Sequence, residues 1–210
     1  SNGGAFYCEI SQSNRHFVTL SHCTFTSNTA GKNGGAVYAM ARDKFTLEYC
    51  TFENNNSPSN GIGHSLWLRV GFNDRYNYNK AVVRGNTFIF TPGNKNSVNV
   101  HIETFPLQGT TTPNANLDFG SNTFTSRNVA VAGYRHLEIA ENRSPFESIN
   151  FDGCNCVQNG QETVTLPYPY GKNAFIHSPL IAFIRIVERT LFDVSFAYIS
   201  FITALNGVIS

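Results

Sequence analysis

The amino-acid sequence predicts an all-β protein with the fold of a right-handed single-stranded parallel β-helix (a solenoid) of about five turns. The main reason is an apolar-x-apolar-x-x-(Cys/Asn)-x-Phe unit that recurs at intervals of about 30 residues. No stretch before about residue 175 has the period of an amphipathic helix. Phe and Tyr are frequent, with 18 and 9 residues, which favours strands. A β-sandwich is the alternative, but its strands alternate in direction and would not repeat one motif in one order.

The repeated unit is clearest in residues 17–25 and 44–52, which have nearly the same sequence. When all copies are aligned, each position of the unit holds side chains of one kind. Such columns are expected of a coil whose successive turns stack about 4.8 Å apart. The aligned columns are Leu20, Leu47, Val83, Phe119 and Phe151; Phe25, Phe52, Phe88 and Phe124; and, at a bend, Cys23, Cys50, Asn86, Asn122 and Cys154.

Strands rich in small or apolar residues are expected between the copies of the unit. They are predicted at 3–7, 34–38, 65–68, 98–102 and 129–131, while residues 136–142 are interpreted as a strand on another face of the same turn. The longer intervals between the later copies predict loops that project from the coil, chiefly 71–79 and 106–116.

The β-helix is predicted to occupy residues 1–170, and residues 171–210 form an apolar C-terminal segment of further strands or a cap. Residues 191–209 approach the length of a membrane span, but Asp193 and the alternation of large and small residues after it favour strands. Membrane association through this segment is therefore the less favoured alternative. Because the chain opens inside a repeat, it is expected to be a piece of a longer protein.

The composition excludes several classes of function. The formal net charge is +1 and the 15 basic residues are scattered, so the chain lacks the basic footprint of a nucleic-acid-binding protein. The 5 cysteines are odd in number and lack paired CxxC spacing, which argues against a zinc site or a full disulfide framework. No metal or other cofactor is predicted. Cys23 and Cys50 would stack on adjacent turns, where either a disulfide or two free thiols is compatible with the spacing.

Candidate functional residues come from the outward-facing columns and from one loop. Asp118 and Asp152 would lie on successive turns with Arg84 one turn away, and polysaccharide lyases and glycoside hydrolases use carboxylates in such arrangements. A solvated outer face is the simpler interpretation of these residues, so catalysis is not predicted. Tyr76 and Tyr78 are the ligand-binding candidates, because aromatic side chains exposed on loops are common in interfaces.

Paired motifs at the start of the chain resemble the repeat of polymorphic outer-membrane proteins. The GGA-apolar motif stands at 3–6 and 34–37, and the FxxN motif stands at 25–28 and 52–55, interleaved in the order of that family. The resemblance covers about residues 1–60. It implies a β-helical passenger domain that is exposed at the cell surface and acts in adhesion.

The expected function is therefore that of a cell-surface or secreted adhesin-like segment, which binds a host-surface protein, a glycan or a partner protein without catalysis. No nucleic-acid partner is expected. Two alternatives stay open. One is a polysaccharide lyase or glycoside hydrolase on the same coil, and the other is a structural spacer of a large surface protein.

Overall fold

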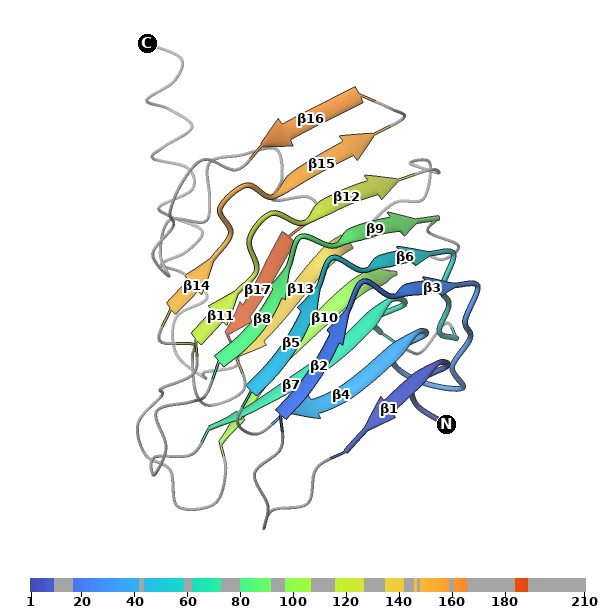
Figure 1. Ribbon diagram of the computed structural model, residues 1–210, viewed down its shortest axis with the longest axis vertical. Coiled ribbons are helices and arrows are strands. Elements are labelled where there is room, and N and C mark those ends of the chain that lie inside the picture. The colour runs from blue at the N-terminus through green and yellow to red at the C-terminus, as the bar shows by residue number, and fades with distance from the viewer. Residues whose placement is uncertain are drawn as a thin grey trace.

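The chain is wound into a coil of β-strands. The computed structural model describes residues 1–9, 17–41, 44–58, 62–72, 80–91, 97–106, 116–126, 135–141, 146, 148–158, 161–165 and 184–188, and the structural statements below concern these residues. They contain strands and no helix, and the strands stack into three sheets (Figure 1). The predicted parallel β-helix is confirmed.

The chain passes through sheets A, B and C in that order and then returns to sheet A. Sheet A contains β1 (Phe6–Cys8), β4 (Val37–Ala41), β7 (Leu66–Phe72), β10 (Val98–Pro106), β13 (Arg135–Glu141) and β17 (Ile184–Glu188). Sheet B contains β2 (Phe17–Ser21), β5 (Lys44–Glu48), β8 (Lys80–Arg84), β11 (Asn116–Asp118) and β14 (Ser148–Asn150). Sheet C contains β3 (Thr24–Thr26), β6 (Thr51–Glu53), β9 (Thr87–Phe90), β12 (Thr123–Ser126), β15 (Asn155–Gln158) and β16 (Gln161–Thr165). Among these strands, only β15 and β16 pair antiparallel.

The interior of the coil is apolar because the register aligns like side chains from strand to strand. In sheet B, Leu20 faces Leu47 and Leu47 faces Val83. The aromatic column of sheet C stacks at ring-centroid distances of 4.7, 4.9 and 5.2 Å. It consists of Phe25, Phe52, Phe88 and Phe124. These columns are the ones predicted from the sequence, and the side chains that alternate with them face outward.

The bend between sheets B and C is held by side chains that bond to the main chain of the preceding turn. Oδ1 of Asn122 accepts the backbone N–H of Asn86 at 2.9 Å, and Nδ2 of Asn122 donates to the carbonyl of Val83 at 2.6 Å. Asn86 binds the N–H of Cys50 and the carbonyl of Leu47 in the same way, at 2.9 Å each. Each asparagine therefore satisfies buried main-chain groups that the bend removes from the sheet ladders.

Cysteine takes the place of asparagine at the start of this column. Sγ of Cys50 accepts the backbone N–H of Cys23 at 3.4 Å and donates to the carbonyl of Leu20 at 3.7 Å. A thiol is a weaker partner than an amide, but it makes the same pattern of contacts. Cys23 and Cys50 are free thiols, so the structure contains the free pair rather than the disulfide.

The motifs of the sequence repeat hold the bends next to sheet A. Oδ1 of Asn55 accepts the backbone N–H of Asn28 at 3.0 Å, and Nδ2 of Asn55 donates to the carbonyl of Phe25 at 2.9 Å, which explains the asparagine of FxxN. In the GGA motif, Gly34 has a φ of 65°, a conformation that glycine adopts without strain. A Cβ at Gly35 would overlap a neighbouring carbonyl oxygen. Both motifs are therefore structural.

One predicted strand has a different place in the structure. β13 pairs with β10 in sheet A, with Leu137 facing Val100 and Ile139 facing Ile102. β13 covers most of the predicted strand at 136–142 and is the strand next to β10, because Leu137 and Ile139 supply the inward side chains that continue the apolar column. The predicted strand at 129–131 lies outside the described residues.

Much of the predicted C-terminal segment lies outside the described residues, including 191–209. Within the segment, β17 pairs with β13 as a parallel strand of sheet A. In the described part of the chain, no helix is long and apolar enough to cross a membrane. The division of the chain at residue 170 stays a prediction.

Candidate functional site

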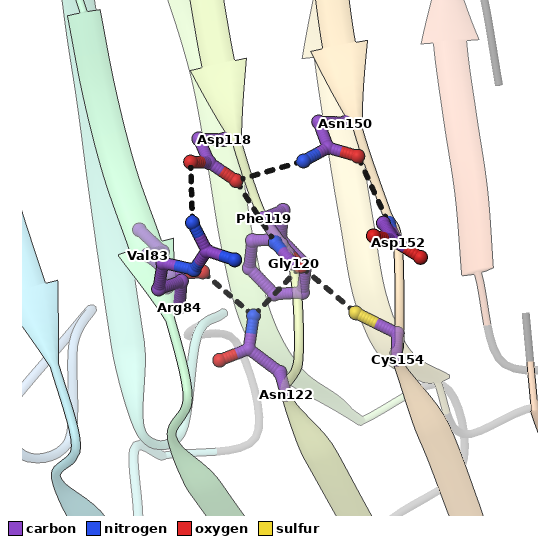
Figure 2. Close-up of polar contacts among 9 residues, drawn as sticks. All are labelled: Val83, Arg84, Asp118, Phe119, Gly120, Asn122, Asn150, Asp152 and Cys154. Atoms are coloured by element: carbon purple, nitrogen blue, oxygen red, sulfur yellow. Dashed lines mark hydrogen bonds and ion pairs between the residues drawn. The ribbon is translucent and has the colours of Figure 1, made fainter. Parts of the chain in front are cut away.

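The candidate site predicted from the sequence lies on the outer face of sheet B. Arg84 ends β8, Asp118 ends β11 and Asn150 ends β14, and the register sets Asp118 beside Asn150. Nη1 of Arg84 lies 3.4 Å from Oδ2 of Asp118, and Nδ2 of Asn150 donates to Oδ1 of Asp118 at 3.1 Å (Figure 2). The predicted neighbours Arg84 and Asp118 are therefore brought together as an ion pair.

The second predicted carboxylate, Asp152, joins this cluster only through its main chain. Its backbone N–H donates to Oδ1 of Asn150 at 3.0 Å, as Figure 2 shows. Oδ1 of Asp118 also accepts the backbone N–H of Gly120 at 3.3 Å. Both oxygens of Asp118 are thus used to hold the ends of neighbouring strands, and no bond in the described residues links the two carboxylates.

The predicted ligand-binding tyrosines, Tyr76 and Tyr78, lie outside the described residues. Trp67, the other aromatic side chain that could stack on a sugar, is only 4 % exposed. Its ring stacks on Tyr38 at 4.3 Å and on His101 at 6.2 Å. Trp67 therefore packs against its own fold and has no free ring face for a ligand.

A second polar cluster, which sequence reasoning missed, lies on the outer face of sheet A. Nδ1 of His101 lies 3.3 Å from Oε1 of Glu138, and Nε2 of His101 lies 3.8 Å from Oε2 of Glu103. Glu103 also pairs with Arg69, whose guanidinium lies 5.1 Å over the ring of Trp67. The cluster links β7, β10 and β13. The signal needed to find it was the register of β13, which alignment of the repeats did not reveal.

The charges in this cluster change how its members titrate. Burial acts to lower the pKa of His101, but the hydrogen bonds and charges of Glu103 and Glu138 outweigh burial and raise this pKa. Burial acts to raise the pKa of Glu103, but His101 and Arg69 outweigh it and lower that pKa. Because His101 and Glu103 are only 3 % and 8 % exposed, the cluster fits a structural role better than contact with a substrate. In the described part of the chain, no group of three or more His, Cys, Asp or Glu side chains could hold a metal ion.

Two further histidines are buried beside aromatic rings. The His64 ring lies 5.3 Å from the Phe90 ring, and the His136 ring lies 5.1 Å from the Phe124 ring. Nδ1 of His64 accepts the backbone N–H of Ser57 at 3.2 Å. Burial lowers the pKa of His64 to about 4 and that of His136 to about 3, so both are neutral at pH 7.

Acidification is expected to destabilise the fold through these two histidines. An unfolded histidine titrates near about pH 6.5, so His64 and His136 bind more protons when the chain is unfolded. Their contribution to stability is present above that pH and is lost as the pH falls toward about 4 and about 3. The midpoint of thermal unfolding, measured by circular dichroism, should therefore fall steadily below about pH 6.5, and less steeply in His136→Phe.

His101 provides the opposite control. Because its folded-state pKa is raised, its contribution to stability is complete below the unfolded value and is lost as the pH rises through the folded value. His101→Gln should keep the acid slope of the wild type and weaken the loss on the alkaline side. A wild-type midpoint that does not change in acid would contradict this account.

One comparison with known proteins bears on the bends and motifs described above. Residues 22–40 match the family model of the Chlamydia polymorphic membrane protein (Chlamydia_PMP) repeat. The chain carries this repeat. The match spans Asn28 of the FxxN motif and the GGA-apolar motif at 34–37, so it confirms the resemblance inferred from those motifs. No curated protein and no solved structure matches the chain.

The polymorphic membrane protein repeat gives a coarse indication of location. Its family is associated with the outer membrane and the cell surface, which supports a surface location for this chain. In the matched range, Asn28 and Gly34 form bends of the coil. The motif residues of the repeat therefore have a structural role at the bends and carry no reactive group.

Proposed function

We propose that the protein is an adhesin-like β-helix segment, displayed at a cell surface or secreted, which binds a host-surface protein, a glycan or a partner protein and catalyses no reaction. The observation that carries the proposal is the polymorphic membrane protein repeat at residues 22–40. The repeat supplies a scaffold whose repeated apolar and asparagine side chains are turned inward. Binding residues can then vary on its outer faces and loops, where protein scaffolds commonly place them.

The geometry on sheet B favours binding over catalysis. A general acid or a nucleophile must approach the reacting atom of a substrate to within hydrogen-bond distance. Both oxygens of Asp118 are instead bonded to Arg84, Asn150 and the N–H of Gly120. Within the described residues, Asp152 is bonded through its main chain alone. This bonding of Asp118 supports the part of the proposal that assigns no catalysis to sheet B.

The substitution Asp118→Asn distinguishes a structural role of Asp118 from a catalytic one. Because the Arg84–Asp118 pair is partly exposed, with 40 % and 14 % of the side chains accessible, its loss should lower the free energy of unfolding by about 1 kcal/mol or less. Urea denaturation measures this change. The intact protein should release no reducing ends and no unsaturated sugars from a panel of polysaccharides. An activity that disappears in Asp118→Asn would replace the binding proposal with the lyase or hydrolase alternative.

The binding function is tested directly on cells. The fluorescently labelled protein should bind cultured host cells saturably, and an excess of unlabelled protein should displace it. Protein unfolded by heat and then cooled is the matched control, and it should show only residual binding. Absence of saturable binding to every cell type tested would favour the structural spacer.

A further inference from the structure

The outer face of sheet C carries a straight row of threonines, here called the threonine ladder. The register makes Thr24 the partner of Thr51, Thr51 the partner of Thr87, and Thr87 the partner of Thr123. Neighbouring strands lie about 4.8 Å apart, so the ladder repeats at that interval along the coil. Figure 1 shows β3, β6, β9 and β12, the strands that carry it, side by side along one edge of the coil.

The hydroxyls of the threonine ladder face away from the core. Each threonine directly precedes a phenylalanine of the buried aromatic column, and successive side chains of a strand point to opposite faces. Thr24 is exposed and Thr51, Thr87 and Thr123 are partly exposed. Within the described residues, no hydrogen bond engages the side-chain hydroxyl of any ladder threonine. Each hydroxyl can therefore both donate and accept a bond from outside.

The surroundings of the ladder carry few charged side chains. The next outward column holds Thr26, Glu53, Ile89 and Thr125. On the other side is the bend, where Tyr49 is 58 % exposed. Its ring lies 5.3 Å from the His22 ring and covers Gly85, where a Cβ would lie 2.8 Å from two ring carbons. The Tyr49 ring therefore lies between His22 and Gly85 on the neighbouring turns.

We propose that the threonine ladder binds a neutral polysaccharide whose chain lies along the axis of the coil. This inference rests on the proposed binding function and names the ligand class of one face. A neutral polysaccharide is an extended chain that presents hydroxyl and C–H groups at regular intervals. The ladder offers a hydroxyl and a methyl group on each rung, so similar contacts can repeat from rung to rung. Individually weak contacts add when they are linked in one chain.

The charge and polarity of the face decide against other occupants. Neither the ladder nor the next outward column contains lysine or arginine, whereas nucleic acids and anionic polymers are bound through basic residues. A protein partner would be expected to seat aromatic or apolar anchors in the middle of its interface. Among the eight residues named for the two columns, Ile89 is the one large apolar side chain, and it is partly buried.

The test compares variants that differ in hydroxyl groups alone. Thr51→Val with Thr87→Val removes two hydroxyls but keeps the β-branched shape that suits a strand. Thr51→Ser with Thr87→Ser keeps the hydroxyls. Thr19→Val, at an exposed position of sheet B, is the matched control. Each protein is run through native gels that contain a neutral glucan, mannan, xylan or galactan, and through gels that contain heparin.

At least one neutral polysaccharide should retard the wild type, the serine double variant and Thr19→Val. The valine double variant should lose about tenfold in affinity, as expected for two lost hydrogen bonds. Retardation should be the same at low and high salt, because no ion pair is involved. Circular dichroism confirms that each variant is folded. If the valine double variant does not fold, Thr123→Val is tested in the same gels.

The proposal is overturned if no neutral polysaccharide retards the wild type, if heparin alone does so, or if the valine variants bind as well as the wild type. The last outcome would leave the ladder as a row of good strand formers. The proposed function fails separately. If the wild type and the valine double variant bind host cells equally, the protein binds cells through a site other than the ladder. If neither protein binds cells, the adhesin-like function is wrong.

Discussion

Replacing Asn122 with leucine is expected to lower the free energy of unfolding by about 3 kcal/mol or more. Asn122 is fully buried, and its amide satisfies the N–H of Asn86 and the carbonyl of Val83. The leucine side chain has the same number and branching of heavy atoms but cannot bond to either group. Each buried main-chain group left without a partner costs about 1–3 kcal/mol. Guanidinium denaturation followed by circular dichroism measures the change.

The control for this substitution is Asn150→Leu. Asn150 bonds to Asp118 on the partly exposed outer face of sheet B, where water can replace the lost partner. Its loss should cost about 1 kcal/mol or less. Equal effects of the two leucine substitutions would mean that the buried asparagine column does not hold the bend.

Replacing Phe88 with alanine is expected to cost about 3–5 kcal/mol. The Phe88 ring is fully buried and stacks on Phe52 at 4.9 Å and on Phe124 at 5.2 Å. Alanine would remove both stacking contacts and leave a cavity in the middle of the aromatic column. Because each turn of a coil contacts mainly its neighbours, the defect should also weaken the coupling between the turns before Phe88 and the turns after it.

The measurement for Phe88→Ala is again chemical denaturation, with attention to the slope of the transition as well as its midpoint. A broader transition would show that the coil no longer unfolds as one unit. Phe17→Ala is the matched control, because Phe17 is 62 % exposed and exposed positions usually change stability by about 0.5 kcal/mol or less. A large loss in Phe17→Ala, or none in Phe88→Ala, would contradict this assignment of the core.

The fold could be predicted because successive turns of a coil place similar side chains at equivalent positions, so the sequence repeats with the length of a turn. Cys50 and Asn86 differ in chemistry, but both satisfy the main chain of the preceding turn, so they occupy one aligned position. The closeness of Arg84 to Asp118 could be predicted for the same reason, since both residues fall in aligned outward columns. Fold and register were therefore accessible wherever the repeated unit was well preserved.

The remaining features depend on information that periodicity does not contain. The cluster of His101 with Glu103 and Glu138 requires the pairing of β10 with β13, and irregular intervals between repeats hide that register. The isolation of the Asp152 carboxylate depends on the direction of one side chain at a bend, where strand alternation no longer applies. Hydrogen bonding by FxxN and the close packing of Gly35 were visible as motifs, but their partners lie on other turns.

The asparagine column has a consequence for how such a chain can change over generations. Asn86 and Asn122 bond to amide and carbonyl groups of the turn before them, and every amino acid except proline offers both groups. The contact between two turns at the bend therefore does not depend on the side chains of the preceding turn. Whole turns can be duplicated, deleted or exchanged between genes, and segments between the bends can diverge, while the hydrogen bonds between turns at the bends are kept. A surface protein built this way can alter what it displays without having to reinvent how it folds.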